Sequence, residues 1–294
     1  MGKWPRLDKI DMVDEQIDDE KYEHQLKKLQ NRLLDLQVHH LRTGGRVMIG
    51  MDGWDAAGKG GLIERTVAGL EPKSVHVWRI GAPTPEEQGR HYLWRFWNRL
   101  PAPGSWAIFD RTWYGRVLVE RIEGFCSKDA WKRAYREINE FERQLTDDGV
   151  RIVKLLVHVS EEEQKRRMID RLTRPYKRHK VGLEDFRNMA KRKEYLDAYD
   201  EMLEKTDTKN APWHVIASDN KKQARLAGLG IIVDALSEGV DLTEHELDPL
   251  IAEAAYKAWG WTLDKAGKSK DEDKKSNDKK GEDKKEQDKA DKKK

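Results

Sequence analysis

A glycine-rich segment with one lysine is the part of the chain best suited to chemistry. It spans residues 53–61 and follows an apolar run that ends at Met51. A strand, a glycine-rich loop and a helix in this order form a P-loop, in which backbone N–H groups, the helix N-terminus and the lysine hold phosphate groups. Lys59 supplies the charge. The segment predicts further phosphate contacts from the backbone of Gly53, Ala56, Ala57, Gly58, Gly60 and Gly61.

The loop departs from the usual P-loop at one position. Gly60 stands where a serine or threonine normally follows the lysine and binds Mg²⁺ through its hydroxyl. The metal therefore needs another ligand, and Asp55, inside the loop, is the candidate. A glycine-rich turn without a ligand is the alternative, but the apolar run before it and the helix start after it favour the P-loop.

A second acidic residue follows another short apolar run, at residues 107–109. An acid at the end of the strand beside a P-loop binds Mg²⁺ directly or through water, which is the Walker B arrangement. The sequence therefore predicts that Asp110 and Asp55 hold the metal together. Arg111 comes next in the chain, and its guanidinium can grip a phosphate group with two parallel hydrogen bonds.

A strongly basic segment lies in the second half of the chain. Ser160 and Glu163 form a capping-box pattern, which predicts the start of a helix over residues 160–173. Pro175 then ends or kinks that helix. Beside a P-loop, such a hairpin indicates a kinase lid over about 160–190 that closes cations over phosphate, whereas a solvated basic face is the alternative. The candidate lid cations are Arg167, Arg171 and Arg174, which share a helix face, followed by Lys177, Arg178 and Lys180.

The body of the chain alternates between short apolar runs and helical segments. This alternation is typical of βαβ units and predicts a doubly wound parallel sheet, with ligands beyond the carboxyl ends of its strands. The predicted fold is an α/β three-layer sandwich of the P-loop class, in which helices flank a parallel five-stranded sheet. We expect strands at residues 46–51, 75–80, 106–110, 150–159 and 213–217. We expect helices at residues 16–42, 58–70, 84–100, 127–148, 160–173, 182–206 and 220–237.

The charge of the chain is concentrated at one end. Residues 265–294 hold 13 lysines and nine acidic residues, and subtracting this net +4 from the chain's +3 leaves a body near −1. Such a segment cannot bury enough apolar surface to offset its ordering entropy, so we expect a disordered, solubilising tail at 263–294. A tether for a polyanion or partner is the alternative. We expect one phosphotransferase domain over 15–262, after an arm of residues 1–14.

Other features exclude several classes of protein. The single cysteine, Cys126, rules out an internal disulfide, and no apolar window is long enough to span a membrane or to form a signal peptide. Motifs for serine hydrolysis, zinc proteolysis or dithiol redox chemistry are also absent from the sequence. A cytoplasmic protein without a membrane partner is expected.

The motifs together resemble the polyphosphate kinase 2 family, over roughly residues 20–237. The resemblance implies a thymidylate-kinase-like P-loop fold with a helical lid. It also implies transfer of phosphate between inorganic polyphosphate and nucleotides with Mg²⁺, for which Mn²⁺ is an alternative. The matching segments are residues 53–61, 109–114, 175–180, 212–213 and 219–225.

The resemblance also implies roles for individual residues. Asp55 and Asp110 would hold the metal and orient the acceptor phosphate, and Lys59 would bind phosphate. Arg111 and Arg171 would stabilise the transferring group. The implied catalytic set is therefore Asp55, Lys59, Asp110, Arg111 and Arg171, with Lys177 and Lys180 as cations of the lid.

The acceptor is predicted from the branch of the family that the chain resembles. Residues 81–87, 92–97 and 114–120 are similar to the polyphosphate:AMP phosphotransferase branch, which favours AMP to ADP and leaves ADP to ATP open. Members of that branch often carry two fused copies of the domain, whereas this chain has one. The resemblance implies a reversible reaction on adenine or guanine nucleotides in a homodimer or homotetramer. Nucleotide contacts are predicted for Tyr114, Arg116 and Glu120, and for Trp113 because of its position after Asp110, with packing in the core as the alternative for Trp113.

Two other functions remain open at this stage. An ATP-dependent nucleoside monophosphate kinase uses the same fold and a similar lid, but it normally keeps the P-loop hydroxyl. A non-catalytic polyanion-binding protein could use the lid and the tail alone, and its binding would fall steeply with salt. The joint presence of Asp55, Lys59 and Asp110 argues against such a binder, and nucleic acid is not an expected partner.

Overall fold

The structure is a computed structural model of the 294-residue chain. Statements about structure refer to the residues that it describes, which are 4–12, 16–242, 247–260 and 262.

The chain forms two compact units, Met1–Leu242 and Thr243–Lys294. In the second unit the described part is mainly helix α11 (Pro249–Trp259), which ends at Gly260 in the left-handed conformation. The predicted domain over 15–262 differs from this division because it included α11. The tail predicted at 263–294 lies outside the described residues, so its disorder stays a prediction.

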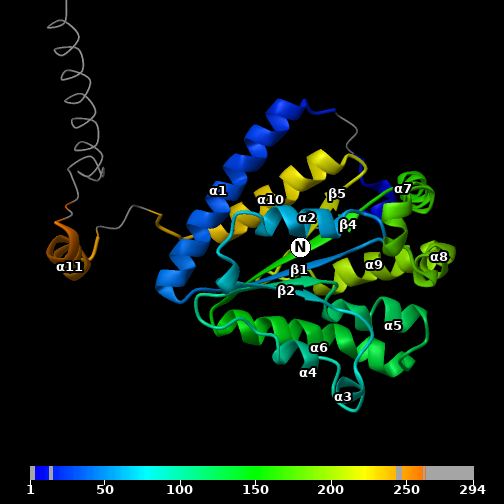
Figure 1. The fold of residues 1–294 in the computed structure, drawn as a ribbon. Coiled ribbons are helices and arrows are strands. Elements are labelled where there is room, and N and C mark those ends of the chain that lie inside the picture. Colours follow the sequence, from blue (N-terminus) through cyan, green and yellow to red (C-terminus); the bar gives the residue numbers. More distant parts are fainter. Residues whose placement is uncertain (1–3, 13–15, 243–246, 261, 263–294) are drawn as a thin grey trace, which may run out of the picture. The chain divides into compact units, whose positions relative to one another are not determined.

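A five-stranded sheet forms the centre of the larger unit (Figure 1). All its strands are parallel and their order is β2-β3-β1-β4-β5, which confirms the predicted α/β fold. β1 lies in the middle and is buried along six consecutive residues, as its apolar sequence requires. The strands are β1 (Arg46–Gly53), β2 (Val75–Arg79), β3 (Trp106–Asp110), β4 (Val150–His158) and β5 (Trp213–Ala217).

The strand register brings the chemical residues to one edge of the sheet. β1 and β3 align Met51 with Asp110, and β1 and β4 align Gly53 with Val157. Asp110 therefore lies level with the entry to the P-loop, at the carboxyl ends of the strands. This is the edge where ligands bind in open parallel sheets.

Helices cover both faces of the sheet and complete the predicted three layers (Figure 1). One face carries α1, α2 and α10, and the other carries α6 and α9. Polar caps start most of these helices; Asp18 accepts from two backbone N–H groups of α1, and Ser127 accepts from one of α6. Their bounds are α1 (Asp19–Thr43), α2 (Lys59–Val67), α6 (Lys128–Asp147), α9 (Arg192–Thr206) and α10 (Lys221–Ser237).

Three further segments form the predicted lid. The Ser160 hydroxyl accepts from the Glu163 N–H at 3.2 Å, so the capping side chain starts the first lid helix where the sequence predicts it. The segments are α7 (Glu161–Thr173), the 3-10 helix η4 (Pro175–Lys180) and α8 (Leu183–Ala190). The remaining short elements are η1 (Leu7–Lys9), η2 (Pro72–Ser74), α3 (Pro85–Gln88), α4 (Trp94–Trp97), η3 (Trp113–Arg116) and α5 (Val119–Ile122).

The helix predicted over 84–100 is wrong. The segment forms two single-turn helices, α3 and α4, and Gly89 ends the first of them. Glu87 is buried and forms ion pairs with Arg95 at 3.2 Å and Arg99 at 2.8 Å. The chain therefore turns back to neutralise a buried carboxylate, and a continuous helix would not allow that turn.

The helix predicted over 182–206 is interrupted at Lys191, whose backbone leaves helical geometry. α9 packs in the core through residues such as Tyr195 and Tyr199, whereas α8 has no buried residue. The two halves lie in different environments, and the interruption lets α8 belong to the lid while α9 belongs to the sandwich.

The described part of the N-terminal arm packs on the larger unit. Leu7 is fully buried, and its N–H donates to the Asp200 carboxylate at 2.9 Å. The Trp4 indole donates to Asp207 at 2.9 Å. Residues of the predicted arm thus contribute to the core beside α9.

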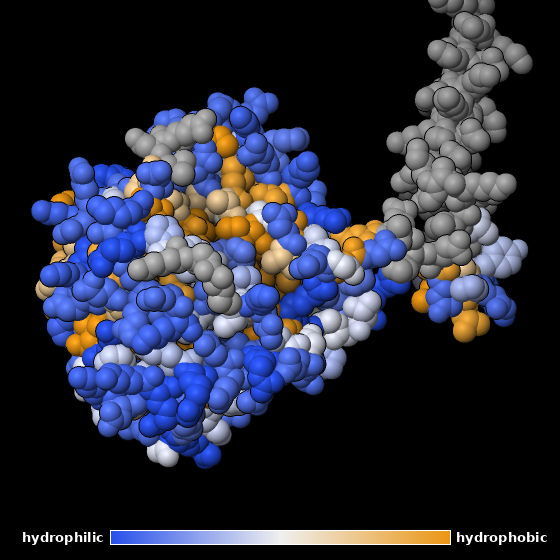
Figure 2. Space-filling model, turned by 180° about the vertical axis from the view of Figure 1, so that it is seen from behind, coloured by the Kyte–Doolittle hydropathy of each residue, from blue (hydrophilic) through white to orange (hydrophobic). Residues whose placement is uncertain are grey.

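The surface opposite the view of Figure 1 is largely hydrophilic, with a hydrophobic area near its middle (Figure 2). Among the described residues, no helix combines the length and the apolar character needed to cross a bilayer.

Candidate active site

The P-loop connects β1 to α2 through residues in unusual backbone conformations. Gly53, Ala56 and Gly58 have φ values of 141°, 60° and 115°, and α2 begins at Lys59. A Cβ atom at Gly53 would lie 2.2 Å from the carbonyl oxygen of Val157. Glycine is therefore required there by both the dihedral angle and the contact with β4.

Lys59 lies at the centre of the loop and is almost fully buried. Its ammonium donates to the carbonyl oxygens of Gly53 at 2.7 Å and Trp54 at 2.9 Å. Burial lowers the pKa of Lys59 below its ordinary value, although the carboxylates of Asp55 and Asp110 favour the charged form. The loop thus holds a cation where the helix N-terminus already attracts anions.

Asp55 points into the same space from the loop. Its Oδ1 accepts from Arg111 at 3.2 Å, and its Oδ2 accepts from the Asn188 amide at 2.7 Å. Burial raises the pKa of Asp55, but the charges of Lys59 and Arg111 and the Asn188 hydrogen bond outweigh that effect and lower the pKa overall. Asp55 is therefore an ionised carboxylate.

Arg111 follows Asp110 with a φ of 67°, which is uncommon for a residue that carries a side chain. Its N–H donates to the Met51 carbonyl at 3.0 Å, which ties the turn after β3 to β1. This strained turn directs the guanidinium toward the P-loop acid instead of along the strand.

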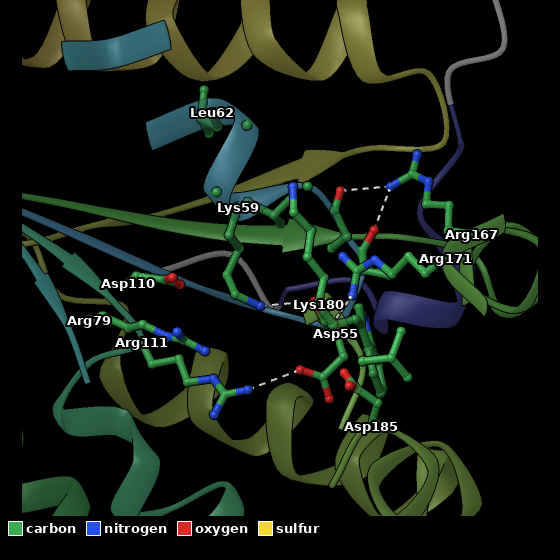
Figure 3. A pocket seen from close by; sticks show the side chains of 18 of the residues that line it. Asp55, Lys59, Leu62, Arg79, Asp110, Arg111, Arg167, Arg171, Lys180 and Asp185 are labelled. Carbon is green, nitrogen blue, oxygen red and sulfur yellow. Dashed lines mark hydrogen bonds and ion pairs between the residues drawn. The ribbon is translucent and has the colours of Figure 1, made fainter. Parts of the chain in front are cut away.

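These residues line one large cleft of about 1130 Å³ (Figure 3). Ten lysines and arginines and six carboxylates contribute to its wall. Lys59 lies between Asp110 and Asp55, and Arg79 and Arg111 approach from the side of β2 and β3 (Figure 3). Cations thus surround Asp55 and Asp110. This arrangement suits a chain of phosphates that is bound together with a metal ion.

Comparison with known proteins shows which family has this sequence. Residues 16–242 match the family described as polyphosphate kinase 2 (PPK2). The chain belongs to the polyphosphate kinase 2 family. The match includes the P-loop, the Asp110–Arg111 pair and the segment predicted as the lid in one continuous stretch.

Characterised relatives in this family differ in the nucleotide that their names give. The chain is 44% identical to a polyphosphate:AMP phosphotransferase of Pseudomonas syringae pv. tomato, over 79% of this chain and 46% of the relative. It is 39% identical to ADP-polyphosphate phosphotransferase 3 of Rhizobium meliloti, over 73% of this chain and 76% of the relative. The chain thus spans about half the length of the polyphosphate:AMP phosphotransferases that it matches.

A solved structure supports the same fold. The crystal structure of polyphosphate kinase 2 from Arthrobacter aurescens TC1 has a TM-score of 0.80 and 32% sequence identity. The similarity covers 88% of this chain and 94% of that one.

The predicted phosphate contact of Arg167 is not favoured by the contacts that this residue makes in the polyphosphate kinase 2 site, although it borders the cleft. It is buried, and its Nε donates to Glu163 at 2.7 Å. One terminal nitrogen donates to the carbonyls of Ala56 and Ala57, and the other donates to those of Ser218 and Asp219. All five N–H groups therefore have protein partners, so Arg167 supports the loop, and a phosphate contact for it stays a prediction.

We expect Arg167→Lys to lower the free energy of unfolding by about 1–3 kcal/mol, because one ammonium cannot satisfy four carbonyls, three of them in buried contacts. Urea unfolding would measure the change. Arg166→Lys is the matched control: Arg166 is its exposed neighbour, which also pairs with Glu163, so its change should stay within about 0.5 kcal/mol. Equal losses of unfolding free energy in both variants would contradict the role of Arg167 in supporting the P-loop.

The other predicted lid cations divide into two groups. Arg171, Lys177 and Lys180 line the cleft. Arg174 and Arg178 are outside its lining; Arg174 pairs with Asp170, and Arg178 donates to a backbone carbonyl of α7. A phosphate contact for these last two stays a prediction that their present contacts do not favour.

The predicted nucleotide contacts of Trp113 and Tyr114 do not fit the structure. Their side chains are 1% and 0% exposed, and both donate to Glu142 in the core. The aromatic residues after Asp110 therefore pack below the site. Arg116 and Glu120 form an ion pair at 3.0 Å outside the cleft lining, so their contact with nucleotide remains a prediction.

Several residues in the cleft or beside it were missed in the sequence analysis. Asp185 and Asn188 come from α8, a helix of mixed composition that carries no recognisable motif. Arg79 is the last residue of β2, an edge strand. No glycine-rich loop follows this strand, so nothing in the sequence indicated a phosphate contact there. Lys221 and Arg225 lie in a segment that the family resemblance included, but without a role; all but Asn188 line the cleft.

The acids of the cleft fit a hard cation. Mg²⁺ is usually held by one or two carboxylates together with water and substrate phosphates, and it rarely has a cage made wholly of protein. Asp55 and Asp110 both line the cleft, and no cluster of three metal-ligating side chains occurs in the part of the chain that is described. Two carboxylates beside a phosphate-binding loop are the donor set that such a metal requires.

Proposed function

We propose that the chain transfers phosphate between inorganic polyphosphate and a nucleotide, with Mg²⁺ or Mn²⁺ held by Asp55 and Asp110. The observation that carries the proposal is the P-loop itself. It has an acid at Asp55 and glycine at Gly60, and it opens into a cleft rich in arginine and lysine. In the transfer, a phosphate oxygen of the acceptor bonds to the terminal phosphorus, and the bond from that phosphorus to the rest of the polyphosphate breaks.

The residues of the cleft have distinct tasks in this proposal. When bound, the metal neutralises charge on the phosphates that flank the bond being broken. Lys59 and the loop N–H groups hold one anion, while Arg111 and Arg171 lie where charge on the transferring group needs compensation. The lid cations Lys177 and Lys180 bind neighbouring phosphates of the polymer and help to exclude water.

We propose AMP as the favoured acceptor, with ADP as the second candidate. Support comes from relatives at 43–44% identity that are named polyphosphate:AMP phosphotransferases, whereas relatives named for ADP and GDP are 36–40% identical. The chain spans only about half the length of those polyphosphate:AMP phosphotransferases, so the choice of AMP is a proposal for this chain. A homodimer or homotetramer and a cytoplasmic location stay predictions.

Nucleotide chromatography tests this proposal. We expect ADP to form from AMP in a reaction that contains the protein, polyphosphate and Mg²⁺ but no ATP. ATP formed from ADP, without any product from AMP, would keep polyphosphate as donor and reverse the acceptor preference. If neither acceptor reacts until ATP is added, the polyphosphate proposal fails and an ATP-dependent nucleoside monophosphate kinase takes its place.

A further inference from the structure

The carboxylate of Asp55 is held on both oxygens by residues from different parts of the chain. Arg111, after β3, donates to Oδ1 at 3.2 Å, and Asn188, on lid helix α8, donates to Oδ2 at 2.7 Å. The Asp55 side chain is only 13% exposed. The shorter of its two hydrogen bonds thus comes from the lid, 133 residues away in the sequence.

The Asn188 amide is itself oriented. Its Oδ1 accepts from the Tyr195 hydroxyl at 3.1 Å, and this leaves the NH₂ group to face Asp55. Tyr195 is buried on α9, with its ring centre 6.4 Å from the rings of both Trp54 and Tyr199. The phenol is therefore fixed by packing, and it fixes which end of the amide meets the acid.

The backbone of Asp55 is held separately from its side chain. Gln164 of α7 donates to the Asp55 carbonyl at 2.9 Å, and Arg192 of α9 donates to the Gln164 side-chain oxygen. The Arg192 guanidinium also lies 4.1 Å from the centre of a Trp54 ring. The main chain and the carboxylate thus have independent supports, so the Asn188 contact has one specific effect: it sets the rotation of the carboxylate.

We propose that Asn188 is a positioning residue that, oriented by Tyr195, fixes the Asp55 carboxylate for the metal. The inference rests on the proposed role of Asp55 as a metal ligand. An ionised carboxylate has about four acceptor directions, and the two hydrogen bonds use one on each oxygen. The others remain for a cation and its water. Outer partners of this kind commonly change metal affinity by about 10–100-fold when removed.

The proposal must be distinguished from simple docking of the lid helix. α8 is also attached to the rest of the larger unit through Arg187, which pairs with Glu123 at 3.0 Å. Asp55 is not among the partners described for Arg187. Arg187→Ala is therefore a matched control, because it weakens the attachment of α8 but leaves the Asn188–Asp55 hydrogen bond in place.

The test is calorimetric titration of the full chain with Mn²⁺. We expect Asn188→Ala to weaken Mn²⁺ binding about tenfold, and Tyr195→Phe to weaken it less but in the same direction. Arg187→Ala should bind Mn²⁺ like the unchanged protein. In phosphotransfer assays, the Mg²⁺ concentration for half-maximal rate should rise by a similar factor in Asn188→Ala, while the rate at saturating Mg²⁺ changes by less than about threefold. Thermal unfolding without metal checks that the variants are folded.

Asp55→Asn separates failure of this inference from failure of the proposed function. If Asp55→Asn binds Mn²⁺ as well as the unchanged protein, Asp55 is not a metal ligand and the proposed metal site is wrong. If Asp55→Asn loses binding but Asn188→Ala keeps it, the positioning role of Asn188 is overturned. Equal losses in Asn188→Ala and Arg187→Ala would overturn it too, since lid docking alone would then explain the effect.

Discussion

Replacing Lys59 by methionine should lower the turnover of polyphosphate-dependent nucleotide phosphorylation by about 10²–10³-fold, the usual effect of removing one preorganised charge from a water-poor site. The ammonium lies at the start of α2 and is held by two loop carbonyls, so it costs no reorganisation when phosphate arrives. Methionine keeps nearly the same volume in an unbranched side chain that is one atom shorter and carries no charge. The measurement is the initial rate of product formation at saturating polyphosphate and Mg²⁺.

A second lysine variant shows whether the effect belongs to the cleft. Lys222 lies at the start of α10 and pairs with Asp19, and it does not line the cleft. Lys222→Met should therefore change the rate by less than about twofold, as expected for an exposed ion pair outside the site. A rate for Lys59→Met within threefold of the unchanged protein would remove Lys59 from phosphate binding. It would also disprove the assignment of this loop as the phosphate site.

The sheet and the P-loop were predictable because the signals for them are local. A buried parallel strand is a continuous apolar run, as in β1 and β4. The P-loop is recognised by the glycines around Lys59. Parallel topology then places Asp110 beside the loop without any further information. The relative order of these elements along the chain was enough to predict which edge of the sheet carries the site.

The roles of single cations were less predictable, and Arg167 shows why. Helical spacing correctly placed it on one face with Arg171, but spacing does not tell what that face meets. Both residues border the cleft, but Arg167 is buried and donates to backbone carbonyls of the P-loop, whereas Arg171 is only half-buried. The difference depends on how closely α7 approaches the loop, which is a property of packing and not of sequence pattern.

Asn188 and Trp113 illustrate the two remaining kinds of failure. Asn188 is a single amide in a short helix of mixed composition, so nothing in its neighbourhood marks it before the fold brings α8 to Asp55. Trp113 lies two residues after Arg111, and this position suggested a ligand contact. However, the turn after β3 directs its side chain inward to Glu142. Proximity along the chain to a functional residue is thus a poor guide to direction.

The ion pair below the site should dominate the stability of this region. Lys154 on β4 and Glu142 on α6 lie 2.8 Å apart, and both side chains are 1% exposed. Burial lowers the pKa of Lys154, and the Glu142 carboxylate opposes that shift. We expect Lys154→Met to lower the free energy of unfolding by about 3–5 kcal/mol, because it leaves a buried carboxylate without its cation. Urea unfolding at neutral pH would measure this loss.

A double variant and a surface control separate the pair from its surroundings. Lys154→Met combined with Glu142→Gln should cost less than the sum of the two single changes, because the stranded charge is then removed as well. Arg143→Met breaks an exposed pair with Asp147 on the same helix, and it should cost only about 0–1 kcal/mol. If Lys154→Met were as mild as Arg143→Met, the buried pair would not hold this part of the core. The Trp113 and Tyr114 hydrogen bonds to Glu142 would then have to support the turn after Asp110 without it.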